Sequence, residues 1–177
     1  MQWTYRGRAF KFGDDVHIDG EIMPLRLVIA REMDPQVLKN HVMQGLDPDF
    51  PQKVKPGDII IGGQRFGCGN PHPQGFLGIK ALGLGIIAEW MPRGAYRNCV
   101  MAGIPTLPNA SGICKMMDNG DQLQVNFQTG ALKNITKKTS MLTEPMPPVL
   151  QEIVAAGGTI AHMKQELIGQ GVITRLT

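Results

Sequence analysis

Cysteines and long apolar runs are scarce in this chain. Only three cysteines, Cys68, Cys99 and Cys114, occur in 177 residues, and no two of them form a CxxC pair. Such a set argues against a disulfide framework and against a metal site built by this chain alone. No apolar run approaches the roughly 18 residues of a membrane-spanning helix, and the opening MQWTYRGRAF lacks the apolar centre of a signal peptide. We therefore expect a soluble, cytoplasmic protein with reduced thiols and no membrane partner.

An excess of one charge is also missing. The 18 Lys and Arg residues against 15 Asp and Glu give a net charge of +3, and the basic residues are scattered apart from the short pair in TKKT. Without a basic stripe, nucleic acid is a poor candidate for a partner. The length suits one domain, residues 1–177, that is large enough to bury a core.

Glycine, in contrast, is concentrated in the stretch GGQRFGCGNPHPQGF, which we call the glycine-rich segment (residues 62–76). It follows the apolar run DIIIG, whose consecutive isoleucines predict a strand buried on both faces. A glycine-rich turn after a buried strand lets backbone N–H groups approach a ligand closely, as in anion-binding nests and at helix N-termini. The alternative is a tight turn with no ligand.

The residues after this segment predict a strand, loop, helix, strand unit. A helix is expected over about residues 74–82, closed by Gly83, and GIIAE follows as the second strand. A further helix in PRGAYRNCVMAG ends at Gly103, and IPTLP returns as a strand. Units of this kind need a parallel crossover, and they place the loop at the carboxyl edge of the first strand, where ligands bind.

The flanking regions complete the prediction of an α/β fold. Asp34 and Pro35 predict the start of a helix in which His41 is partly buried. The stretch GDQLQVNFQTGALKNIT predicts a β-hairpin with its turn at QTG. A final amphipathic helix, in PPVLQEIVAAGGTIAHMKQEL, is expected to be divided at Gly157 and Gly158.

Four stretches in order carry a resemblance to a known family: GRAFKFGDDVHIDGEIMP, VKPGDIIIGGQRFGCG, GIKALGLGIIAEWMPRGAYRNCVMAGIP and PPVLQEIVAAGGTIAHMK. They resemble the small subunit of 3-isopropylmalate dehydratase and its aconitase-family relatives over nearly the whole chain. The resemblance implies a swivelling β/β/α three-layer domain that closes over a large aconitase-type subunit. That partner would carry a 4Fe–4S cluster, and none would be bound by this chain alone.

The glycine-rich segment is where the sequence departs from the family. Members usually follow FGCG with Ser-Ser-Arg-Glu-His, in which the first serine is the catalytic base and the arginine grips substrate carboxylate. Here the matching residues are Asn70, Pro71, His72, Pro73 and Gln74. Asn70 cannot replace a base, because its amide does not titrate in the useful range. His72 remains as a base or an anion anchor, with a surface-loop or structural capping role as the alternative, and we take His72 and Asn70 as the catalytic candidates.

The family pattern also indicates substrate-binding candidates. They are Asp19 and Arg26, the loop residues Gly67, Cys68 and Gly69, and the apolar residues Leu27, Val28 and Ile29 after the arginine. An apolar pocket disfavours a third carboxylate, so a substrate with an uncharged substituent is expected. Two alternatives stay open: residues 27–30 as a core-facing strand, and Cys68 as a small buried packing residue. The same pattern includes Arg93, Tyr96 and Asn98, for which we favour a role in orienting the loop through hydrogen bonds.

The sequence therefore favours one subunit of an iron–sulfur hydro-lyase that acts, with its large subunit, on a malate-like 2-hydroxy dicarboxylic acid. Two other classes remain. One is a non-catalytic paralogue that keeps the subunit interface after losing the serine base. The other is a stand-alone domain that binds a small anion without chemistry.

Overall fold

The structure is a computed structural model, and it describes residues 2–173. Within this range seven strands form one curled sheet in the order β4-β3-β2-β1-β5-β6-β7. Their bounds are β1 Thr4–Lys11, β2 Ile59–Gly62, β3 Gly85–Ala88, β4 Thr106–Leu107, β5 Gln122–Asn126, β6 Ala131–Asn134 and β7 Thr139–Leu142. The helices are α1 Leu25–Ile29, α2 Pro35–Leu38, the 3-10 helix η1 Lys39–His41, α3 Phe50–Lys53, α4 Gln74–Ala81, α5 Arg93–Ala102, α6 Ile113–Met116, α7 Pro148–Ala155 and α8 Thr159–Gly169.

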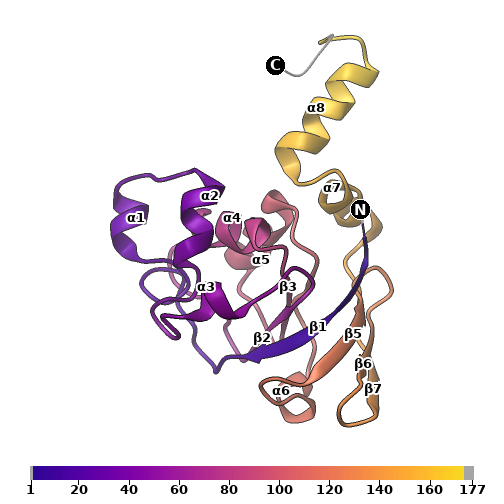
Figure 1. Ribbon diagram of the computed structural model, residues 1–177. Coiled ribbons are helices and arrows are strands. Elements are labelled where there is room, and N and C mark those ends of the chain that lie inside the picture. The colour runs from indigo at the N-terminus through magenta and orange to yellow at the C-terminus, as the bar shows by residue number, and fades with distance from the viewer. Residues whose placement is uncertain (1, 174–177) are drawn as a thin grey trace.

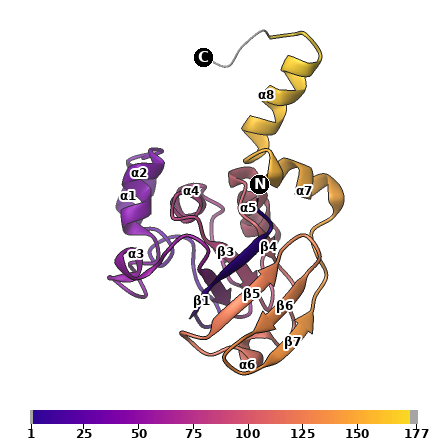
Figure 2. The ribbon, with the colours of Figure 1, turned by 45° about the vertical axis from the view of Figure 1, so that its right-hand side comes forward.

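Strand β1 divides the sheet into two halves. On one side it pairs in parallel with β2, which continues in parallel to β3 and β4. On the other side it pairs antiparallel with β5, and β6 and β7 follow as an antiparallel meander. The antiparallel half curls away from the helices α1 to α5 (Figure 2). The predicted strands and hairpin are therefore confirmed, and β7 extends the hairpin.

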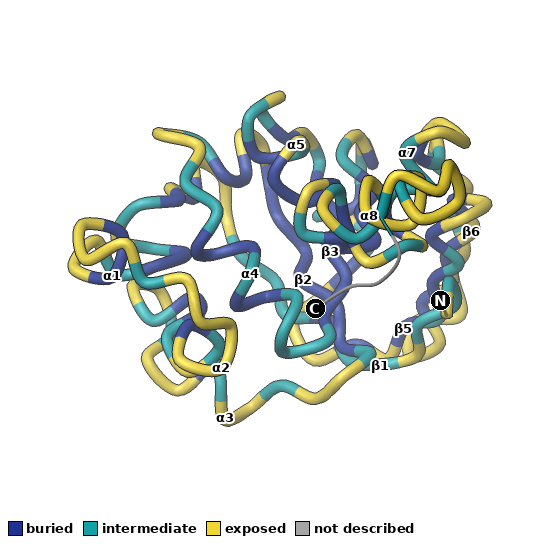
Figure 3. The backbone as a smooth tube through the Cα atoms, turned by 90° about the horizontal axis from the view of Figure 1, so that it is seen from above, coloured by how far each residue is buried: buried dark blue, intermediate teal, exposed yellow. Residues whose placement is uncertain are grey.

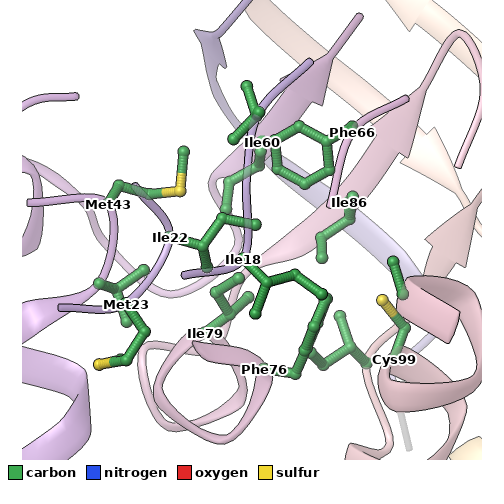
Figure 4. Packing of buried hydrophobic residues seen from close by; sticks show 14 of the residues in the cluster. Ile18, Ile22, Met23, Met43, Ile60, Phe66, Phe76, Ile79, Ile86 and Cys99 are labelled. Carbon is green, nitrogen blue, oxygen red and sulfur yellow. The ribbon is translucent and has the colours of Figure 1, made fainter. Parts of the chain in front are cut away.

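Burial on both faces explains the isoleucine run of β2. Ile60 packs with Ile86 of β3 in a core cluster that the helices cover, whereas Ile59 and Ile61 point into a second cluster. The first cluster also contains Ile18, Ile22 and Phe76 (Figure 4). The second is enclosed by apolar residues of the antiparallel half: Leu123, Val125 and Leu132. Helices, parallel half and antiparallel half thus form the α, β and β layers of the expected fold.

The longer helices end where glycines allow a left-handed backbone. Helix α4 ends just before Gly83, with φ +71°, and α5 ends at Gly103, with φ +76°. The expected final helix is divided between α7 and α8 at Gly157 and Gly158, with φ +99° and +116°. Helix α8 projects from the body of the molecule and is largely exposed (Figures 1 and 3).

Two segments differ from the sequence-based expectation. Residues 25–29 form the short helix α1, neither a loop nor a strand. The helix expected from Asp34 does begin there, since the Asp34 carboxylate accepts a hydrogen bond from the Gln36 N–H, but it continues only as the 3-10 helix to His41. His41 is partly buried, as predicted. No helix of residues 2–173 has the length and apolar character to cross a membrane.

Candidate functional site

The glycine-rich segment begins at the carboxyl end of β2 and is held by backbone hydrogen bonds to a distant part of the chain. The N–H groups of Gly67 and Cys68 donate to the Val16 carbonyl at 2.8 and 3.0 Å, and the Ile18 N–H donates to the Cys68 carbonyl at 2.9 Å. These bonds pair residues 16–18 with residues 67–68. They bring the turn that carries Asp19 beside the loop that carries His72.

Two glycines allow this pairing. Gly67 and Gly69 have φ values of +81° and +92°, which side chains rarely adopt. A Cβ on Gly67 would collide with Ala95 of α5, and one on Gly69 would touch the imidazole of His17. His17 is exposed at the site, and the sequence analysis did not assign it a role.

Asp19 is fixed by a tight turn with buried residues on both sides. The Met23 N–H donates to the Ile18 carbonyl at 3.0 Å, and Gly20, with φ +89°, donates from its N–H to Met23 at 2.8 Å. Ile18, Ile22 and Met23 are fully buried in the core below the turn (Figure 4). The backbone of Asp19 is therefore anchored, while its side chain stays partly accessible.

The backbone of His72 is held by the prolines on either side of it and by two hydrogen bonds. Pro71 and Pro73 limit the backbone on either side, and the His72 N–H donates to the Asn70 carbonyl at 2.8 Å. The Asn98 amide, only 5% exposed, donates from Nδ2 to the His72 carbonyl at 3.4 Å. Asn98 therefore makes a hydrogen bond of the kind expected for it, whereas the same role for Arg93 and Tyr96 stays a prediction. The sequence alone did not show which loop atom Asn98 binds, because the two residues lie on different elements.

The imidazole of His72 faces the carboxylate of Asp19. Nε2 of His72 lies 3.6 Å from Oδ2 of Asp19, and the two side chains are 39% and 24% exposed. This distance is an ion-pair distance, longer than a hydrogen bond. Sequence reasoning proposed both residues but did not predict that they would be paired.

Two side-chain oxygen atoms, one on Asp19 itself and one on Gln74 just after His72, are buried without a hydrogen-bond donor among the described residues. Oδ1 of Asp19 and Oε1 of Gln74 have no hydrogen-bond donor among the described residues, and Gln74 is only 5% exposed. Gln74 is also the first residue of α4, whose N-cap, Pro73, has no capping side chain. The first N–H groups of α4 therefore have no capping side chain at this end of the segment.

The remaining loop candidates differ in exposure. Cys68 is partly buried, its Sγ lies 3.6 Å from the Val16 carbonyl, and burial raises the pKa of its thiol. Asn70 is exposed. Cys68 therefore has the partial burial of a packing residue, whereas the Asn70 amide is free to meet a ligand.

The apolar candidates after Arg26 do not share one environment. Leu27 and Val28 are buried in the first core cluster, whereas Ile29 is 74% exposed. Arg26 is exposed, and its Nη2 lies 3.4 Å from Nδ1 of His41. Within residues 2–173 no hydrogen bond or ion pair joins Arg26 to Asp19 or His72. Of the three apolar residues, only Ile29 presents its side chain to an incoming molecule.

A 4Fe–4S cluster needs several thiolate ligands close together. The described residues contain no group of three His, Cys, Asp or Glu side chains that would hold a metal ion. Cys99 is moreover fully buried, and burial raises the pKa of its thiol to about 12. The side chains described for this chain do not fit a cluster, and a cluster on a partner remains a prediction.

Comparison with known proteins places this geometry in a family, although no family model matches the chain. It is 40% identical over 168 residues to the isopropylmalate/citramalate isomerase small subunit of Methanocaldococcus jannaschii, covering 94% of this chain and 98% of that one. It is 37% identical over 163 residues to the 3-isopropylmalate dehydratase small subunit of Thermodesulfovibrio yellowstonii, covering 92% and 95%. A crystal structure of 3-isopropylmalate dehydratase (leuD) from M. jannaschii superposes with a TM-score of 0.86 at 34% identity, covering 96% and 98%. The chain therefore belongs to the small-subunit family of the 3-isopropylmalate dehydratases, which are hydro-lyases.

Proposed function

We propose that this chain, with a large aconitase-type subunit that carries a 4Fe–4S cluster, dehydrates and isomerises a malate-like 2-hydroxy dicarboxylic acid. Family membership supports the reaction class. The observation that carries the assignment to this chain is the His72–Asp19 pair, because His72 lies on the segment where the family places its serine base. A titratable side chain, at the position of the family's arginine, is thereby kept on the same loop as Asn70, which occupies the position of the serine.

In this proposal His72 takes over the proton transfer. The C–H bond next to a substrate carboxylate breaks, and the proton moves to the imidazole. The electron pair forms the C=C bond as the neighbouring C–O bond breaks and the hydroxyl group leaves. The proton and the hydroxide together make up the water molecule that a hydro-lyase removes from its substrate.

Binding of the substrate carboxylates needs donors other than the family's arginine, which His72 replaces. The uncapped N-terminus of α4 supplies N–H groups and the positive end of the helix dipole. The exposed amide of Asn70 is a further donor. Arg26 is a third candidate, since its guanidinium is exposed and, within residues 2–173, its one polar contact is with His41. Gly67, Cys68 and Gly69 contribute through the backbone shape of the loop.

The substituent of the substrate is proposed to be uncharged. Ile29 is the apolar residue after Arg26 that is exposed, and an apolar side chain does not compensate a buried carboxylate. A substrate with an alkyl substituent is therefore favoured over one with a third carboxylate.

Reconstitution tests this function. The chain is co-expressed anaerobically with its large subunit, and a panel of 2-hydroxy diacids with alkyl or carboxylate substituents is screened for dehydration. We expect turnover of an alkyl-substituted diacid by the complex, and neither iron absorbance nor hydratase activity in the isolated chain. A stable complex without turnover of any diacid would instead support a non-catalytic paralogue. Absence of a complex together with anion binding by the chain would support a stand-alone binding domain.

A further inference from the structure

We propose that Asp19 is a positioning residue that orients the imidazole of His72 as a base, and that it does not itself bind a substrate carboxylate. The proposal rests on the function proposed above, in which His72 acts on the substrate. It separates the two roles that the sequence left open for His72, base and anion anchor.

The ring atom that faces Asp19 supports this assignment. Asp19 Oδ2 lies 3.6 Å from Nε2, so Nε2 is the ring nitrogen that faces the carboxylate, and a small approach of the two side chains would let the carboxylate accept the Nε2–H of a neutral imidazole. In that tautomer the lone pair is on Nδ1, and Nδ1 of His72 makes no hydrogen bond within residues 2–173. Catalytic hydrogen bonds are often long in the free protein and shorten when the complex closes. In this arrangement Nε2 faces Asp19, and Nδ1 is the nitrogen that can take a proton from the substrate.

Both side chains start from anchored backbone. The turn of Asp19 is tied to the loop by the Ile18 N–H, which donates to the Cys68 carbonyl at 2.9 Å. On the loop side, the His72 carbonyl accepts from Asn98 of α5. A base held from both sides needs little rearrangement to reach its working geometry.

Charge argues against the anchor role. The carboxylate of Asp19 would neutralise an imidazolium at His72, so the pair would offer little net positive charge to a dianionic substrate. Asp19 would also repel a substrate carboxylate brought to the same place. A base gains from the same neighbour, because the carboxylate stabilises the imidazolium that forms when the proton is taken up.

The unfavourable burial of one Asp19 oxygen also supports a positioning role for this residue. Its Oδ1 is buried without a donor among the described residues, although the side chain as a whole is partly exposed. An unpaired buried carboxylate oxygen destabilises a fold. Such a side chain is more readily explained by a role at the site than by a contribution to stability.

A double-mutant cycle in the reconstituted complex tests the proposal. Asp19→Asn, His72→Gln and the double variant are compared with the wild type for kcat and KM. We expect His72→Gln to lower kcat by about 100-fold or more. Asp19→Asn should lower kcat on the order of 10- to 100-fold with KM nearly unchanged, because a positioning residue acts through the base. The double variant should be no slower than His72→Gln, since Asp19 has nothing left to orient.

Other outcomes overturn the proposal in distinguishable ways. If Asp19→Asn raises KM whether or not His72 is present, Asp19 is a substrate ligand. If Asp19→Asn lowers KM while His72→Gln raises it, His72 is an anchor whose charge Asp19 was competing for. If His72→Gln keeps full activity, the proposed function of His72 itself fails. Loss of activity in His72→Gln with none in Asp19→Asn removes only the positioning role.

Two controls separate positioning from folding. Asp15→Asn removes another carboxylate from the same region, and it should leave kcat unchanged, because Asp15 pairs with the exposed Arg65 and, among the described residues, has no hydrogen bond or ion pair with His72. Asp19→Glu restores the carboxylate and should recover part of the kcat that Asp19→Asn loses. If Asp19→Asn disturbs folding, its melting temperature will fall and Asp19→Glu then decides: no recovery of kcat in a complex that assembles normally contradicts the proposal.

Discussion

Gly67 of the glycine-rich segment packs directly against Ala95 of helix α5. A Cβ built on Gly67 would lie 2.6 Å from the Cβ of Ala95, and Gly67 also has a φ of +81°. The loop therefore lies against α5 because there is no side chain at this position. The same helix carries Asn98, which binds the His72 carbonyl, so the spacing between loop and helix also sets where His72 lies.

Gly67→Ala is expected to destabilise the fold and to displace the loop. The left-handed backbone costs about 1–2 kcal/mol, and the collision with Ala95 adds roughly 1–3 kcal/mol. Gly120→Ala is the matched control, because Gly120 has a φ of +89° and open space around it. Denaturant unfolding should show a larger loss of free energy for Gly67→Ala, and the reconstituted complex should lose turnover with this variant alone. Equal losses in the two variants would mean that the loop moves away from Ala95 without cost.

Stability should fall at alkaline pH because of Cys99. Its pKa is raised from 9.0 to about 12 by complete burial, so an unfolded chain releases the proton at lower pH than the folded one. The stabilising contribution is complete below about pH 9 and is lost as pH rises toward 12, at about 1.4 kcal/mol per pH unit. Urea unfolding at about pH 8 and about pH 10 measures this slope.

Cys99→Ala is the control for this prediction. It should lower stability at every pH, because it removes buried volume, but it should flatten the dependence between about pH 9 and pH 10. The pKa of Tyr96, also raised to about 12 by burial, starts from 10.0 and affects stability mainly above pH 10. An unchanged slope in Cys99→Ala would assign the pH dependence to another group.

Asn70 and His72 should give different kinetic signatures. Asn70→Ala removes a hydrogen-bonding amide that does not titrate, so we expect KM to rise several-fold with a smaller change in kcat. A loss of kcat comparable to that of His72→Gln would instead place Asn70 in the proton transfer. Steady-state kinetics of the two single variants in the complex separates these cases.

Ile29→Arg should change substrate preference without unfolding the protein. Ile29 is 74% exposed, so a charged side chain is tolerated there, and a cation would favour a substrate with an additional carboxylate. We expect the ratio of kcat/KM for alkyl- and carboxylate-substituted diacids to shift by about 10-fold or more. Leu142→Arg, at a comparably exposed apolar residue of β7, should leave the ratio unchanged. An unchanged ratio in Ile29→Arg would remove α1 from the specificity argument.

Parts of the site were visible in the sequence because their signals are local. The isoleucine run of β2, the glycine that ends α4 and the glycine pair between α7 and α8 all act through neighbouring residues. The replacement of the family's serine and arginine by Asn70 and His72 is equally local. These features were enough to predict the fold class, the helix ends and the loop at the carboxyl edge of β2.

The environments of the individual candidates required the tertiary structure. Leu27, Val28 and Ile29 form one apolar run in the sequence, but the helical turn of α1 buries the first two and exposes the third. The pairing of His72 with Asp19 was likewise hidden, because backbone hydrogen bonds between residues 16–18 and 67–68 create it. Sequence periodicity reports which face of an element is apolar. Which side chains from distant segments meet is decided only when the chain packs, because that depends on long-range hydrogen bonds and on glycines that permit close approach.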